Sequence, residues 1–286
     1  MSQNDRAIIF IHGIGGKPRK DPYLREWIAA LRHSLWVDIP DDAFRMAYWA
    51  DLRGLPATVE TQREVVRALS PVQRAALLGT KSEKKAALPL QDKAVFGARG
   101  GLAGLGRRLL RRAVEVAEPL IRQFLDRFVN DVHGYFYEEG KRQQISEVLK
   151  TELQSASQAG KRIALISHSM GTVIALDVLK DLQVPIEAFV TMGSPLGSEF
   201  IRDKLGSPSY PPHVRRWLNV FDGTDPVTLP DQQLWNDYTL KRARLIVDKM
   251  VRENFSPQGD RDPHHWFGYL NSQEVGDFIS HFWIAP

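Results

Sequence analysis

The sequence contains no cysteine in its 286 residues. That absence excludes disulfide bridges, thiolate metal ligands and a cysteine nucleophile. The chain also lacks any uninterrupted apolar run of about 18 residues, so it predicts no membrane-spanning helix. Only a short, mostly polar segment precedes the apolar residues 7–11, which are too few for the apolar region of a secretory leader, and a cytoplasmic location is therefore expected.

The overall composition is that of an ordinary globular protein, but the charge is unevenly distributed. Hydrophobic residues make up 43% and charged residues 25% of the chain, whose net charge is +4. Residues 61–112 alone hold twelve Lys or Arg against three Asp or Glu, a net charge of +9. The basic character therefore belongs to one segment and not to the whole protein.

Short β-type apolar runs alternate with segments of helical periodicity over most of the chain. Such alternation predicts an α/β fold, in which parallel strands are joined by helices. One helix is expected to begin with Asp21 as its N-cap, and a second to cover residues 141–159. The last helix is expected to have Asn271 as its N-cap. The expected strands are residues 7–11, 44–49, 162–166, 188–192, 216–221 and 243–248.

The alternation stops between residues 52 and 140, where prolines and glycines interrupt helical segments. We interpret residues 52–140 as a helical, basic cap inserted into a core made of residues 1–51 and 141–286. This insertion carries the positive charge described above.

The strongest chemical signal is Ser167-His168-Ser169-Met170-Gly171, between an apolar strand and an apolar helix. A serine hydroxyl is a weak nucleophile and needs an exposed position, a base and nearby amide donors. A sharp strand-to-helix turn with small flanking residues supplies that position, which makes Ser169 the candidate nucleophile. The alternative is that Ser169 only caps the helix. His168 is not expected to act as the base, because a neighbour at such a turn points away.

A second glycine-rich turn, His12-Gly13-Ile14-Gly15-Gly16, follows the first strand. Glycines there allow backbone amides to face a developing oxyanion. A phosphate-binding loop would need glycine and Ser/Thr where Ile11 and Pro18 stand, so that alternative fails on spacing.

These two motifs resemble those of serine esterases and lipases of the α/β-hydrolase superfamily, especially the bacterial lipases. The resemblance implies a mostly parallel sheet with helices on both faces and a cap. It also implies that the backbone amides of Ile14 and Met170 form the oxyanion hole, while His12 supports the loop. The turn at residues 191–197 is similar to one that lines the pocket in such lipases.

The acid and the base of a triad are expected after Ser169 in the order Asp, then His. Asp222 and Asp225 both follow the strand at 216–221. The family pattern, a glycine shortly before the acid and Val or Ile two residues after it, is matched by residues 223–227 and selects Asp225. His264 and His265 precede the last helix, and relatives often place histidine three residues before a tyrosine. Neither fits this spacing, and His265 is preferred because it comes nearer, with His264 as the alternate.

The basic insertion allows a second interpretation. Arg107, Arg108, Arg111 and Arg112 form like-charge pairs on one predicted helix with apolar neighbours, which suits contact with an anionic membrane surface. The alternative is a solvated face on the cap. Nucleic acid is not expected as a partner, because few aromatic residues accompany the charges. No metal and no cofactor are expected, since the histidine pair lacks further ligands at metal-binding spacing.

The sequence therefore predicts a serine hydrolase that cleaves carboxylic esters, lipid esters included. The alternatives are acyl transfer to an acceptor other than water, and a non-catalytic protein that uses the basic cap to bind a membrane surface or a partner.

Overall fold

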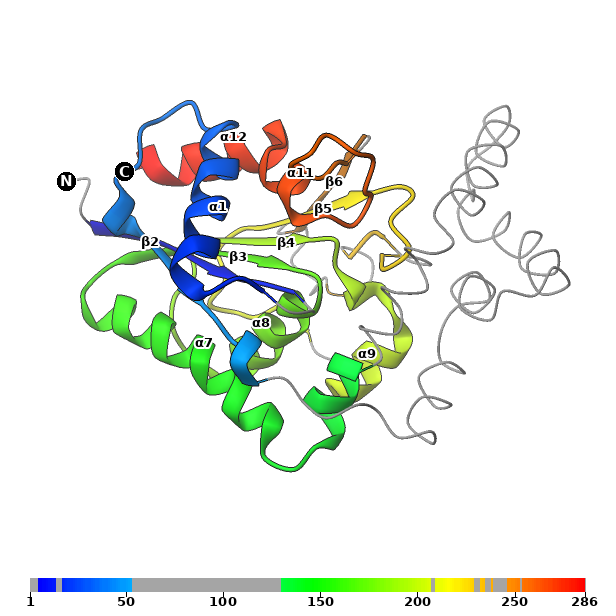
Figure 1. Ribbon diagram of the computed structural model, residues 1–286. Helices are drawn as coiled ribbons and strands as arrows, with labels where there is room; N and C mark the ends of the chain where they lie inside the picture. The colour runs from blue at the N-terminus through cyan, green and yellow to red at the C-terminus, as the bar shows by residue number, and fades with distance from the viewer. Residues whose placement is uncertain are drawn as a thin grey trace, which may run out of the picture.

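A computed structural model describes residues 5–13, 17–52, 130–206, 209–228, 232–234, 238, 246–252 and 254–285. Its centre is a parallel six-stranded sheet with the spatial order β2-β1-β3-β4-β5-β6, so the predicted α/β class is confirmed (Figure 1). The strands are β1 (Arg6–Ile11), β2 (Phe44–Ala47), β3 (Arg162–His168), β4 (Ala188–Met192), β5 (Trp217–Asp222) and β6 (Ile246–Val251).

Helices cover both faces of the sheet, as Figure 1 shows. One face carries α1 (Lys20–Arg32), α11 (Trp266–Leu270) and α12 (Gln273–Ile284). The other carries α7 (Lys141–Gln158), α8 (Met170–Asp181) and α9 (Glu199–Lys204). Short 3-10 turns lie at Asp41–Ala43, Ala50–Leu52 and Pro195–Gly197.

The two faces bury separate apolar clusters because side chains alternate along each strand. On β1, Ile9 and Ile11 pack toward α7 and α8, whereas Ile8 and Phe10 pack toward α1 and α12. All four side chains are at most 1% exposed, which is typical of a parallel sheet buried on both sides.

The strand order contains one point at which the connections of neighbouring strands run to opposite sides. The chain leaves β1 toward β2 on one side, and β3 returns to pair with β1 on the other. In open α/β sheets, ligands bind outside the carboxyl ends of the strands where the order reverses in this way. The ends of β1 and β3 are occupied by the two glycine-containing motifs.

Several boundaries differ from the sequence predictions. Helix α1 begins at Lys20 with Arg19 as N-cap, so Asp21 lies in its first turn. Helix α12 has Ser272 as N-cap, whose side chain accepts from the amide of Val275, because Asn271 already ends α11. Strand β6 runs from Ile246 to Val251, three residues past the expected end at 248, and residues 243–245 lie outside the described residues.

Most of the predicted cap, residues 53–129 with the four arginines at 107, 108, 111 and 112, lies outside the described residues. Where the chain returns, Val132 and Tyr135 are buried in the same cluster as α7 and α8. The end of the insertion is therefore part of the core packing. Within the described ranges, no helix combines the length and apolarity that a bilayer crossing demands.

Candidate active site

Ser169 occupies a strained turn between β3 and α8. Its φ of 54° and ψ of −128° make it the one described non-glycine residue with positive φ. L-residues avoid this region, and such strain persists where the surroundings impose it, often at functional sites. Here the amide of Ser169 donates to the carbonyl of Met192 at 3.0 Å, and Thr172 donates both its amide and its hydroxyl to the carbonyl of Ser169. The turn is held on both sides.

The residue at the first motif position, Ser167, replaces the glycine more usual in such a turn. Its side chain is fully buried and its hydroxyl donates to the carbonyl of Val190 at 2.7 Å. Serine is accommodated there because the neighbouring strand offers this acceptor.

His264 joins Ser169 to Asp225. The Nε2 atom of His264 lies 2.9 Å from the hydroxyl of Ser169, and its Nδ1 lies 2.8 Å from Oδ2 of Asp225. A carboxylate can only accept, so Nδ1 carries a proton and, in the neutral ring, Nε2 is left to accept from the serine. The predicted Ser169 and Asp225 are thus brought together, through the alternate histidine.

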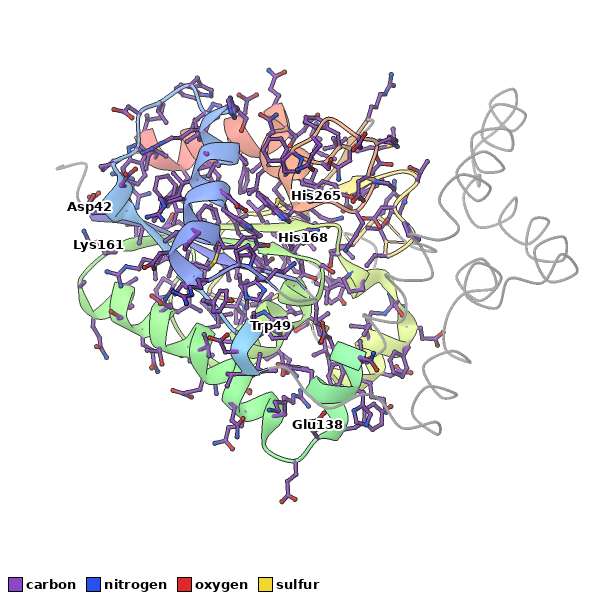
Figure 2. All side chains as sticks on the ribbon, viewed as in Figure 1. Asp42, Trp49, Glu138, Lys161, His168 and His265 are labelled. Carbon is purple, nitrogen blue, oxygen red and sulfur yellow. The ribbon has the colours of Figure 1, made fainter. Side chains whose placement is uncertain are left out.

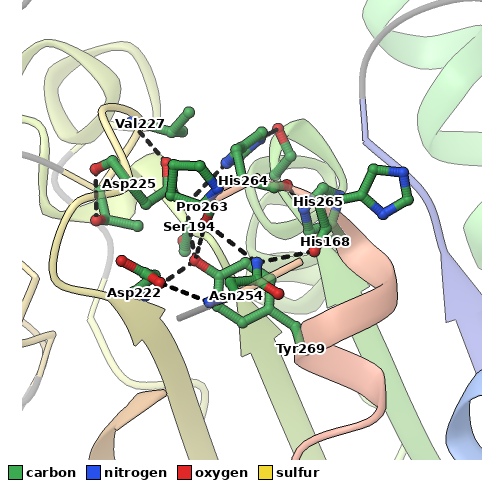
Figure 3. Close-up of polar contacts among 12 residues, drawn as sticks. His168, Ser194, Asp222, Asp225, Val227, Asn254, Pro263, His264, His265 and Tyr269 are labelled. Atoms are coloured by element: carbon green, nitrogen blue, oxygen red, sulfur yellow. Dashed lines mark hydrogen bonds and ion pairs between the residues drawn. The ribbon is translucent and has the colours of Figure 1, made fainter. Parts of the chain in front are cut away.

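His265, which the sequence analysis preferred, does not reach Ser169. Its Nδ1 accepts from the amide of Phe267 at 3.2 Å and caps the N-terminus of α11. Figure 3 shows His264 beside Asp225 while His265 points elsewhere. Adjacent side chains in a turn face different directions, so only one histidine can face the serine. The assignment of His265 is wrong for this geometry.

Asp225 is completely buried, and both of its carboxylate oxygens accept hydrogen bonds. Its Oδ1 accepts from the amide of Val227 at 2.9 Å, and its Oδ2 accepts from His264 and from the hydroxyl of Tyr269, both at 2.8 Å. In the described part of the chain no Lys or Arg pairs with it. Its main charged partner is therefore the imidazole.

Asp222, the alternate acid, faces a different set of donors. Its carboxylate is 2% exposed and forms an ion pair with Arg261 at 2.9 Å. It also accepts from Thr224 and from the amide of Asn254. Asp222 therefore holds the segment after β6 against the end of β5, whereas His264 is bound to Asp225.

Two glycines make the close packing around these residues possible. A Cβ added to Gly13 would lie 2.5 Å from Cβ of Ser169. A Cβ added to Gly193, whose φ is +53°, would lie 3.0 Å from Oδ2 of Asp225 and 3.2 Å from Cε1 of His264. Any larger residue would displace Ser169 or the loop in the first case, and would crowd Asp225 and His264 in the second.

The expected oxyanion donors are only partly within the described residues. Met170 is the first residue of α8, so its amide has no acceptor inside the helix and faces the turn. Ile14 lies outside the described residues. Gly13, next to it, is in close contact with Ser169, which places the start of the predicted loop beside the nucleophile.

His12 supports this loop from within. Its Nε2 accepts from the amide of Trp49 at 3.1 Å, its Nδ1 contacts the carbonyl of Gly13 at 2.8 Å, and its ring stacks on Trp49. Burial lowers the pKa of His12 to about 3. The ring is therefore neutral, and the Trp49 amide, which can only donate, leaves the proton on Nδ1 for Gly13.

The loop that carries His264 is fixed by residues that the sequence analysis missed. Asn254, fully buried, donates from its side-chain amide to the carbonyls of Pro263 and His265, one on each side of His264. His168 contacts the carbonyl of His264 through Nε2 at 2.9 Å. All three consecutive carbonyls are thus bound, as Figure 3 shows for this cluster. No motif marks Asn254, and in the sequence nothing distinguishes it from its polar neighbours Arg252 and Glu253.

His168 is a structural member of this cluster. Burial lowers its pKa well below the ordinary value, so the ring stays neutral, and its contact with a carbonyl puts the proton on Nε2. In Figure 2, Lys161 lies where β3 begins, and His168 and His265 lie toward the opposite end of the strands. The proton of the His168 ring is bound to a backbone carbonyl, which agrees with the expectation that His168 does not act as the base.

Comparisons with known proteins add little to this site. No family model matches the chain, and no curated protein matches it significantly. One solved structure, described as an uncharacterized protein from Pseudomonas aeruginosa, is 11% identical and has a TM-score of 0.28. The match covers 87% of this chain and 40% of that one, so the chain spans less than half of its neighbour's length. A likeness at this level carries no argument, and function must be inferred from the residues themselves.

Proposed function

We propose that the protein is a serine hydrolase of the α/β-hydrolase type that cleaves carboxylic esters, lipid esters included. The observation that carries the proposal is the continuous hydrogen-bonded chain from Ser169 through His264 to Asp225. Nucleophile, base and orienting acid within such distances are the geometric signature of nucleophilic acyl transfer.

In the first half of the reaction, the hydroxyl oxygen of Ser169 attacks the ester carbonyl carbon. Its proton passes to Nε2 of His264, while Asp225 holds Nδ1–H and stabilises the positive ring. Collapse of the tetrahedral intermediate breaks the bond to the alcohol oxygen, which leaves with the proton from His264. The product of this half is an acyl ester on Ser169.

In the second half, water attacks the acyl carbon and gives a proton to His264. The bond to the Ser169 oxygen breaks, the proton returns to that oxygen, and the carboxylic acid leaves. In both halves the charge on the carbonyl oxygen would be received by the amides of Met170 and Ile14, as the resemblance implies. Donors at the start of a helix suit this role because their hydrogens are free and prepositioned.

The test is labelling with a fluorophosphonate, which reacts with activated serines. The native chain is expected to be labelled, and Ser169→Ala is expected to lose all labelling while keeping its thermal unfolding midpoint. Persistence of label in Ser169→Ala would place the nucleophile elsewhere. Absence of label in the native chain, together with no turnover of p-nitrophenyl esters of several chain lengths, would refute the hydrolase proposal.

The adjacent histidines offer a matched pair of variants for the same assay. His264→Ala should reduce kcat by about 10⁴-fold or more, since the base is lost. His265→Ala should cost less than about tenfold, through the loss of a helix cap. The reverse ranking would return the base to His265.

A further inference from the structure

The hydroxyl of Tyr269 lies at the junction of three segments behind the proposed triad. Tyr269, on α11, is completely buried. Its hydroxyl lies 2.8 Å from Oδ2 of Asp225, 2.9 Å from the amide of Asp222 and 3.0 Å from the carbonyl of Pro263. Figure 3 shows these contacts converging on one oxygen atom.

The direction of each hydrogen bond follows from what the partners can do. The amide of Asp222 can only donate, so the Tyr269 oxygen accepts there. The hydroxyl has one proton for two acceptors, and hydrogen bonds to a carboxylate are stronger than those to a neutral carbonyl. The Pro263 carbonyl also has a donor in Asn254. The proton of Tyr269 therefore goes to Asp225.

Tyr269 keeps that proton at any ordinary pH. Burial, followed by the charges of Asp225 and Asp222, raises the pKa of Tyr269 well above its usual value. The hydroxyl is a permanent donor to the same carboxylate oxygen that receives Nδ1–H of His264.

We propose that Tyr269 is a positioning residue of this site, whose hydroxyl shares Oδ2 of Asp225 with His264 and so orients the carboxylate and limits how much of its charge the imidazole receives. The inference rests on the proposed hydrolase function and adds a fourth member to its triad. Tyr269 acts through Asp225; in the described residues its hydroxyl has no contact with Ser169.

The other groups around His264 allow the effect of Tyr269 to be isolated. The ring of His264 faces Ser169, Asp225 and the neutral ring of His168, whose centroid is 4.8 Å away. Asp262 accepts from the backbone amide of His264, and His265 is its neighbour in sequence. The charge of Lys17 acts on His168 and His265. None of these contacts involves the tyrosine hydroxyl. Besides Asp225, that hydroxyl contacts the amide of Asp222 and the carbonyl of Pro263, and Asn254 still binds the Pro263 carbonyl when the hydroxyl is removed.

The test is Tyr269→Phe, measured as kcat and KM for a p-nitrophenyl ester across pH. With one donor removed, more of the Asp225 charge falls on the imidazole, which favours its protonated form. The acid limb of the kcat/KM profile should therefore move to higher pH by about half a unit or more, with kcat down about tenfold and KM unchanged.

The matched control is Tyr135→Phe. Tyr135 is also a buried tyrosine that donates to a buried carboxylate, Asp177, at 2.6 Å, outside the site. Tyr135→Phe should lower the thermal unfolding midpoint and leave the kcat/KM pH profile unchanged. If Tyr269→Phe behaves the same way, with lost stability and an unmoved acid limb, its role is only structural and the inference is overturned.

Two further variants test the same inference. In an Asp225→Asn background, Tyr269→Phe should cost less than about twofold in kcat, and a full tenfold loss there would refute action through Asp225. If Tyr269→Phe fails to fold, a monofluorinated tyrosine at position 269 retains the contacts and donates more strongly. It should move the acid limb to lower pH, and no movement would overturn the inference. Fluorophosphonate labelling of the native chain separates these outcomes from failure of the hydrolase proposal itself.

Discussion

Two buried aspartates of this protein each accept a hydrogen bond from a buried tyrosine, but their remaining partners differ. Asp177, on α8, is paired with Arg142 at 2.6 Å and Lys180 at 2.9 Å. Asp225, after β5, has His264 in place of those cations. The same tyrosine–carboxylate contact is thus used once beside two permanent charges and once beside a group that can gain and lose a proton.

The difference separates a structural carboxylate from one suited to catalysis. Burial opposes ionisation of Asp177, but hydrogen bonds from Arg142, Tyr135 and Lys180 outweigh it and lower its pKa. Its charge is neutralised at all times. The charge of Asp225 is available to stabilise a positive imidazole when a proton arrives, which is the role of the acid in a triad.

The largest expected effect comes from replacing each aspartate by its isosteric amide. Asp225→Asn should lower kcat by about 10⁴-fold, because the amide no longer enforces the tautomer of His264. Asp177→Asn should leave kcat unchanged per folded molecule and reduce the free energy of unfolding by about 2 kcal/mol, because charged hydrogen bonds are lost. Steady-state kinetics and urea unfolding of both variants measure the contrast, and equal effects on kcat would remove it.

Adding one methyl group beside the nucleophile should produce the next largest effect. Gly13→Ala places a Cβ within 2.5 Å of Cβ of Ser169, so the loop or the turn must move. We expect a kcat loss of about 100-fold, typical of a misplaced nucleophile or oxyanion donor. Gly140→Ala is the control. A Cβ there meets nothing within 4 Å, so the strain of its φ of +73° should lower stability and leave kcat per folded molecule unchanged. Unchanged kcat in Gly13→Ala would show that the packing is looser than described.

A smaller effect is expected from replacing Arg261, the cation that is paired with the buried Asp222. Arg261→Met leaves Asp222 buried without its ion pair, although Thr224 and Asn254 still donate to it. The free energy of unfolding should fall by about 2 kcal/mol, less than for a fully buried pair because the guanidinium is 43% exposed. Activity should fall by about tenfold, since the histidine loop loses an anchor. Lys180→Met, which leaves Asp177 paired with Arg142, should change stability by less than about 1 kcal/mol. A larger loss in that control would contradict this reasoning.

The last effect concerns stability against pH rather than activity. The pKa of His12 is about 3 in the folded chain and near 6.5 when unfolded, so below pH 6.5 the unfolded chain binds the extra proton. Its contribution to stability is complete above pH 6.5 and falls by about 1.4 kcal/mol per pH unit toward pH 3. His12→Gln should flatten this slope in unfolding measured from pH 7 to pH 4. An unchanged slope would assign the pH dependence to other groups.

Much of the fold followed from residue patterns, and the exceptions have local causes. The strand predicted at 188–192 matches β4, and the strand before Ser169 is β3. The short helix α11 was not predicted, because five residues give no measurable periodicity. Its presence then displaced the predicted cap of α12 from Asn271 to Ser272.

The site divides in the same way. Ser169 and Asp225 were predicted because strand ends and glycine spacing mark them locally. The preference for His265 rested on a spacing that neither histidine fits, and the geometry brings His264 to Ser169 instead. The distinction comes from Asn254, which lies ten and eleven residues earlier in the chain and binds the carbonyls on both sides of His264.

The amino-acid sequence by itself determined the series of buried strands and the two glycine-containing turns at their ends, since periodicity and steric limits act between near neighbours. Only the tertiary structure decided which histidine faces Ser169 and which oxygen of Asp225 it shares with Tyr269. Those choices depend on hydrogen bonds between β5, the segment after β6 and α11, and such contacts form only when the sheet brings distant parts of the chain to one edge.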